Sequence, residues 1–142
     1  MTFFTRLITL AIMLMPILAH SHGAPRITVE ETITINAAPA DVWNAIRNFD
    51  SIHTWHPAIE STKASGNEKD ATRTLTLGNG GTIEETLKKV DHKKMVMNYQ
   101  ITSMSSAGEI DDHGTPHEIP VVPVSKYKSW LTVKADADGS KV

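Results

Sequence analysis

The sequence predicts an α+β domain, with one strand and one short helix followed by a run of antiparallel strands. Three observations indicate this class. Residues 26–35 alternate between apolar and polar side chains, which is typical of a half-buried strand. Val42, Ile46 and Phe49 then recur at helical spacing. Beyond residue 60, alternating segments are separated by glycine, asparagine and aspartate turns, with no internal repeat and no linker, so we expect a single domain.

The first strand, Arg26–Ile35, places Ile27, Val29 and Ile33 in one phase together with Glu31. The helix begins near Pro39, which suits a first helical turn, and Asp41 complements the positive end of the helix dipole. Trp43 lies beside the apolar stripe. The helix is therefore short and amphipathic, and its apolar side is expected to cover a sheet.

The later segments predict a meander of strands. A weak strand covers Ser61–Ser65, and two stronger strands, Ala71–Leu77 and Thr82–Val90, flank a Gly-Asn-Gly-Gly hairpin turn. A further strand runs from Met95 to Ile101, and the last one, Tyr127–Ala135, leads into an Asp-Gly turn where the chain stops before a returning strand. Between them, Ser103–Pro123 contains three prolines and is predicted as a long loop, with a short extended stretch at Ile119–Val122.

The N-terminus predicts export. Arg6 supplies a positive charge, Leu7–Leu18 is an apolar run, and Ala19-His20-Ser21 offers small residues at the cleavage positions, so residues 1–21 form a secretory signal peptide and residues 22–142 the domain. The run is too short for the roughly 20 residues that cross a bilayer, so no stable membrane span is expected after cleavage. We expect an exported protein.

Composition excludes several function classes. The 142 residues carry 14 Lys and Arg, 16 Asp and Glu, and no Cys. The formal charge of -2 offers no basic surface for a phosphate backbone, so nucleic acid is not an expected partner. Absence of Cys excludes disulfides, thiol nucleophiles and Cys-ligated zinc. No motif for nucleotide binding or for a Ser-His-Asp triad occurs, and no cofactor is predicted.

Three charged residues lie in apolar phases of predicted strands: Glu31, Arg73 and Glu85. An unpaired charge in such a place would cost several kcal/mol, so these side chains either pair with each other or line a wet cavity. Three interpretations stay open: an ion-pair network centred on Arg73, a polar floor that recognises a ligand, and acid/base catalysis by a Glu85 whose pKa is raised by burial.

The histidines raise the alternative of a metal-binding module. His53 and His56 lie three residues apart, a second group of donors occurs in the predicted loop, and cleavage after Ser21 would expose His22 as an N-terminal chelator of copper. The donors in the loop are Asp111, Asp112, His113, His117 and Glu118. Rim, packing and solvated-loop roles are the competing interpretations, and the sequence assigns no metal site.

An ordered set of motifs is similar to a known superfamily. The motifs are Ala38-Pro39-Ala40-Asp41-Val42-Trp43, Trp55-His56-Pro57, Arg73-Thr74-Leu75-Thr76-Leu77, Gly80-Gly81, Glu85-Thr86-Leu87, Pro123-Val124 and Tyr127. Over residues 26–142 the chain resembles the polyketide cyclase/dehydrase branch of the START-like (SRPBCC) superfamily. With its signal peptide it is most similar to the MxaD-type periplasmic accessory proteins of methanol oxidation.

The resemblance implies a helix-grip fold, in which a curved antiparallel sheet wraps a long C-terminal helix around a cavity. The last strands and that helix have no counterpart before Val142, so the domain is expected to be C-terminally incomplete, with an exposed sheet face and low stability. The loop Ser103–Pro123 is longer than the connection typical of the family.

The resemblance favours a non-catalytic protein that binds a small apolar or amphipathic ligand and serves methanol dehydrogenase or its cytochrome. The alternatives are a cyclase or dehydratase that uses Glu85 and His56, and the metal-binding module. The predicted ligand-binding residues are Glu31, Trp55, His56, Arg73, Glu85, Met97, Tyr99 and Tyr127.

Overall fold

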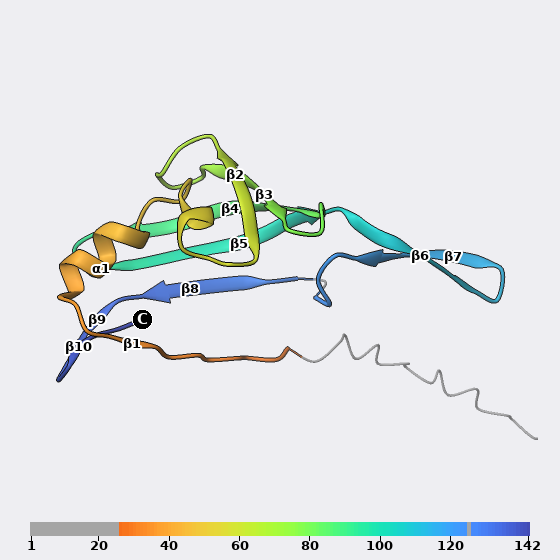
Figure 1. Cartoon of the computed structure of the whole chain (residues 1–142). Helices are drawn as coiled ribbons and strands as arrows, with labels where there is room; N and C mark the ends of the chain where they lie inside the picture. Colours follow the sequence, from red (N-terminus) through yellow and green to blue (C-terminus); the bar gives the residue numbers. More distant parts are fainter. Residues whose placement is uncertain (1–25, 125) are drawn as a thin grey trace, which may run out of the picture. The chain divides into compact units, whose positions relative to one another are not determined.

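The structure is a computed structural model that describes residues 26–124 and 126–142 (Figure 1). The chain divides into two units after Glu30, and all regular secondary structure described below lies in the second, residues 31–142. The predicted signal peptide, residues 1–21, lies outside the described residues. None of the helices within them is long and apolar enough to cross a membrane.

Ten strands and two short helices follow one another along the described residues. The helices are α1 (Pro39–Ile46) and the 3-10 helix η1 (Ile52–Thr54). The strands are β1 (Thr34–Ile35), β2 (Ile59–Ala64), β3 (Thr72–Leu77), β4 (Thr82–Asp91), β5 (Val96–Met104), β6 (Ser106–Asp112), β7 (Thr115–Pro120), β8 (Lys128–Thr132), β9 (Lys134–Asp136) and β10 (Gly139–Lys141).

The main sheet is antiparallel and has the order β2-β3-β4-β5-β8. A small sheet joins β1, β10 and β9, and β6 pairs only with β7. The hairpin predicted around the Gly-Asn-Gly-Gly turn is confirmed as β3–β4, and Gly80 has the positive φ of 86° that such turns require. The α+β helix-grip class predicted from the sequence is confirmed by this arrangement.

The predicted helix is confirmed as α1, with Pro39 in its first turn and Asp41 close behind. Its apolar side buries Val42 and Trp43, and Phe49 three residues beyond its end is fully buried. These side chains pack with Leu87, Met97, Tyr99 and Val133 from the sheet and its continuation. A second cluster, Ile52, Ile59, Leu75 and Ile83, joins η1 to the other end of the sheet. Both clusters lie on the same face of β3 and β4, which is the face that carries the candidate site.

The prediction of a strand over Arg26–Ile35 is wrong for most of its length. Within the described residues only Thr34–Ile35 pairs as β1. The preceding residue, Ile33, exchanges two backbone hydrogen bonds with Val142. Ile27, Val29 and Ile33 are exposed. Alternation alone does not bury a strand, because burial also needs a partner surface for the apolar phase.

The prediction of a loop over Ser103–Pro123 is also wrong. Ser103 and Met104 end β5, and Ser106–Pro120 form the β6–β7 hairpin. The hairpin turns at His113-Gly114, where both residues have positive φ. A bulge between Ser106 and Gly108 interrupts its register. Proline is typical of loops, but a two-stranded ribbon has free edges on both sides that tolerate residues without an N–H.

The chain also contains the start of a returning strand that the sequence was predicted to lack. The Asp-Gly turn leads into β10, which pairs with β9 and with β1. Gly139 has a φ of +131°, and a Cβ there would lie 2.3 Å from the Ile35 carbonyl oxygen. The turn and the close approach therefore both require glycine, and they bring β1 next to β10. The predicted strand Tyr127–Ala135 is confirmed in two pieces, β8 and β9.

Candidate functional site

A buried ion pair lies at the centre of the sheet face that α1 and η1 cover. Arg73 on β3 is directly opposite Glu85 on β4, and both side chains are almost fully buried. The Arg73 Nε donates to Glu85 Oε2 at 2.6 Å. Of the three interpretations that the sequence left open, the structure shows the ion pair centred on Arg73, formed with one glutamate.

The Arg73 guanidinium is held from three sides. Its Nη1 donates to the Phe49 carbonyl oxygen at 2.9 Å. Its central carbon lies 4.1 Å from the centre of the Phe49 ring and 4.6 Å from that of Tyr99, within the range of cation–π attraction. Nη2 lies 2.6 Å from Glu85 Oε2 without hydrogen-bond geometry, so this buried nitrogen has no hydrogen-bond partner among the described residues.

Only one oxygen of the Glu85 carboxylate accepts a hydrogen bond within the described residues. Both contacts of Arg73 reach Oε2; Oε1 accepts no hydrogen bond from the described residues but keeps some contact with solvent, because it is not one of the fully buried atoms without a partner. Burial raises the pKa of Glu85 above 4.5, although the charges of Arg73 and His56 oppose that rise. A carboxyl group in this state suits two roles: accepting a hydrogen bond from a ligand, or exchanging a proton with one.

The segment after α1 brings His56 into the field of the pair. The His56 Nδ1 accepts a hydrogen bond from the Ala58 N–H at 3.3 Å. The ring stacks edge to face with Trp55, with 5.9 Å between the ring centres. Both side chains are exposed. They are therefore accessible to a ligand, whereas Arg73 and Glu85 are not on the surface.

The other predicted site residues occupy different environments. Tyr99 lies against Arg73, and burial raises the pKa of its hydroxyl. Met97 is packed in the core with the α1 side chains, so its structural environment is that of a core residue. Tyr127 is exposed, and its carbonyl oxygen accepts the Ile101 N–H just before β8.

Glu31 is not part of this cluster. The prediction that it lies inside the fold is wrong, because its side chain is exposed and forms none of the described ion pairs. Glu31 lies before the Ile33–Val142 hydrogen bonds, and the phase that it shares with Ile33 stays on the surface.

The donors that raised the metal alternative do not converge. Within residues 26–124 and 126–142, no group of three or more His, Asp and Glu side chains could hold a metal ion. In the β6–β7 hairpin the His113 Nδ1 contacts the neighbouring Asp112 carboxylate at 2.6 Å, and both side chains are exposed. His22 lies outside the described residues.

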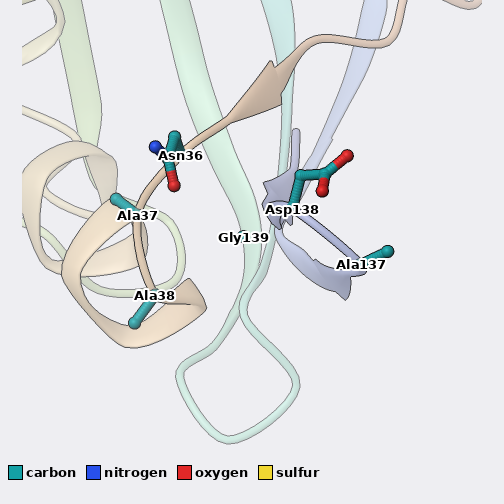
Figure 2. A pocket seen from close by; sticks show the side chains of 6 residues that line it. All are labelled: Asn36, Ala37, Ala38, Ala137, Asp138 and Gly139. Carbon is teal, nitrogen blue, oxygen red and sulfur yellow. The ribbon is translucent and has the colours of Figure 1, made fainter.

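Two depressions occur away from the ion pair. One, of about 640 Å³, has as its two walls the Asn36–Ala38 segment and the Ala137–Gly139 turn (Figure 2). Small side chains and backbone dominate it, and Asp138 is its only titratable group. The other, of about 300 Å³, lies at the base of the β6–β7 hairpin. Neither is lined by Arg73 or Glu85.

Sequence reasoning missed the role of Phe49. Its helical spacing predicted a core residue, which is confirmed, but the structure adds that its carbonyl oxygen and its ring both hold Arg73. Any residue type can supply a main-chain carbonyl, so the sequence does not reveal this hydrogen bond. The detectable signal was Arg73 itself, since a buried guanidinium requires acceptors beyond a single carboxylate.

The fold defines a class of protein, the helix-grip α+β domains. The family model described as "Polyketide cyclase / dehydrase and lipid transport" matches residues 26–142. The chain belongs to that family. No curated protein matches the chain.

Solved structures agree with the fold. The chain is similar to XoxI from Bacillus cereus (26% identity, TM-score 0.60, covering 78% of this chain and 66% of that one). It also resembles an uncharacterized protein from Bacillus thuringiensis (25%, 0.60, 78% and 68%). Ara h 8.0201 shares the fold at 19% identity (0.57, 78% and 69%). The chain spans about two thirds of the length of these structures.

Proposed function

We propose that the protein binds a small amphipathic ligand on the sheet face of β3, β4 and β5, with Glu85 as its polar anchor. The observation that carries this is the half-satisfied carboxylate. A fold gains little from a buried ion pair that hydrophobic residues of similar volume would replace without loss, and Oε1, which is not one of the fully buried atoms without a partner, has no donor among the described residues. A ligand hydroxyl or amide N–H would satisfy Oε1.

The surroundings of the pair favour a ligand that is mostly apolar. Phe49, Tyr99 and Leu87 are buried beside Arg73 and Glu85, and Trp55 and Tyr127 offer exposed aromatic surface. Such a site, apolar with one or two polar groups, orients a ligand by its head group and holds it by its body. The family to which the chain belongs is described as including lipid transport.

A matched pair of probes tests this proposal. 1-Decanol carries one hydroxyl donor, and its methyl ether has the same chain without the donor. We expect decanol to bind about tenfold more tightly, since a hydrogen bond to a charged group contributes about 1.5–3 kcal/mol. The readout is tryptophan fluorescence during titration, with Trp55→Phe to locate the signal.

Glu85→Gln sharpens the same test, because it keeps the shape of the side chain and removes the charge. The preference for decanol over the ether should shrink in this variant. Equal affinities of the two probes for the natural protein, or binding of neither, would contradict a ligand site anchored on Glu85.

We further propose that the protein acts in the periplasm as a non-catalytic accessory of the methanol dehydrogenase and cytochrome system. The Arg6-containing start with its apolar run and small cleavage residues supports export. The ordered motifs around Trp55-His56-Pro57 and Arg73–Leu77 support the MxaD-type assignment. A periplasmic form that begins at His22 by mass, and native mass spectrometry that finds the dehydrogenase or its cytochrome bound, are the expected results. A full-length cytoplasmic product would contradict export, and the absence of both partners would contradict the accessory role.

An enzyme of cyclase or dehydratase type is the second candidate, and the raised pKa of Glu85 together with the nearby charge of His56 favours it. It requires Glu85 as a proton acceptor or donor and His56 as its complement. Turnover of a polyketide-like substrate that falls by orders of magnitude in both Glu85→Gln and His56→Gln would support it over simple binding.

A further inference from the structure

The β6–β7 hairpin has no partner surface within the described part of the chain. Every residue of both strands is exposed. Its links to the main sheet lie at its base, where Val121 N–H donates to Ser105 O at 3.3 Å and Ser105 N–H donates to Thr82 O at 2.9 Å. Figure 1 shows the ribbon continuing beyond the end of β5. A lone two-stranded hairpin is at best marginally stable in water, so its projection calls for an explanation beyond folding.

The two faces of the hairpin differ in chemistry. The register places Glu109 opposite Glu118, with Asp111 on the same face. Ile110 and Ile119 lie diagonally on the other face and are 54% and 39% exposed. One face therefore carries three acids, and the other carries two exposed isoleucines together with Asp112 and His117. Exposed aliphatic side chains that share a face in this way mark a contact surface more often than isolated ones do.

Charge decides which kind of partner fits. Ser106–Pro120 contains four acidic residues and neither lysine nor arginine. A second copy of the hairpin would bring like charges together, and an anionic lipid surface would repel it. Pro116 and Pro120 each remove an N–H from β7, which disfavours the addition of another strand at that edge. A basic protein surface is the complement that remains.

The depression at the base of the hairpin has the shape of an anchor site. It holds about 300 Å³ and is lined by Met104, Ser105, Ser106, Glu118, Ile119, Pro120 and Val124. Its walls are largely apolar, and Glu118 is its only charged group. A lysine or arginine matches this combination, because its methylene stem packs on apolar surface while its cationic head meets a carboxylate.

We propose that the β6–β7 hairpin is a docking element for a partner protein with a basic surface. One lysine or arginine of the partner enters the depression beside Glu118, and the partner wraps around the hairpin so that it also covers Ile110 and Ile119 on the other face. This surface is separate from the Arg73–Glu85 site, so the proposal stands or falls independently of ligand binding.

Site-specific photo-cross-linking identifies the partner. A photoreactive phenylalanine analogue replaces Ile110 in the full chain, expressed in its native host, and the same analogue at the exposed Trp130 on β8 is the control. We expect a protein adduct specific to position 110, with cross-linked peptides that map to a lysine- or arginine-rich surface. Adducts only with a second copy or with lipid, or none above the control, would overturn the proposal.

Charge reversal then tests the purified complex. Glu118→Lys should slow association with the identified partner by about tenfold and flatten its dependence on salt. Glu68→Lys is the matched control, since Glu68 is equally acidic and exposed but lies between β2 and β3. Glu68→Lys should leave the rate within about twofold. Equal effects of the two variants would overturn specific docking at the hairpin.

Discussion

Two cross-strand pairs of charged residues show how differently one geometry is used in this protein. Arg73 faces Glu85 across β3 and β4, and Glu109 faces Glu118 across β6 and β7. The first pair has opposite charges and is buried, whereas the second has like charges and is exposed. Burial demands a partner for every charge, while water screens repulsion well enough to permit the second pair. The β6–β7 acids do not stabilise the fold, so their place must be explained by what meets them.

Breaking the buried pair should have the largest effect. Arg73→Ala leaves the Glu85 carboxylate buried without its cation and removes the donor to the Phe49 carbonyl. We expect the free energy of unfolding to fall by about 3–5 kcal/mol at pH 7, with a melting temperature lower by on the order of 10–20 °C. Urea denaturation followed by circular dichroism measures it. An unchanged unfolding curve would contradict the interior pairing.

A double-mutant cycle separates the pair from its surroundings. Arg73→Met combined with Glu85→Met removes both charges and keeps much of the volume, so it should recover most of the stability that Arg73→Met alone loses. A double variant as unstable as the sum of the single variants would show that the two residues act independently.

The pH dependence of stability should change by a smaller amount. Burial raises the pKa of Glu85 above its value of 4.5 in the unfolded chain, so the folded state holds the proton more tightly. The stability that this contributes is fully present below pH 4.5 and is lost as the pH rises through the raised pKa. The unfolding free energy of the natural protein minus that of Glu85→Gln should therefore decrease as the pH rises over that range. Denaturation in buffers from pH 4 upward measures it, and a difference that grows with pH would contradict the raised pKa.

The sequence predicts the buried pair far better than the hairpin, for a physical reason. Arg73 and Glu85 stand out because each charge interrupts an apolar phase within a strand whose hairpin turn fixes the register. In Ser103–Pro123 no apolar phase exists to interrupt, so proline and glycine were the strongest local signals and indicated a loop. Glu31 shows the converse error, since its phase was apolar but no surface covers it. Patterns identify a face, and only tertiary contacts decide whether it is buried.

Repairing the exposed pair should have the smallest effect. Glu109→Lys places opposite charges across β6 and β7 and should stabilise the hairpin by about 0.2–1 kcal/mol, which corresponds to a rise of up to about fivefold in amide protection. Hydrogen exchange of the β6 and β7 amides measures it, with Glu60→Lys on β2 as the control. The global unfolding free energy should stay constant, because the hairpin is linked to the sheet at its base. The same substitution should weaken docking of a basic partner, so that hairpin stability and partner affinity change in opposite directions. If hairpin stability and partner affinity rise together, the acidic face does not serve to dock a basic partner.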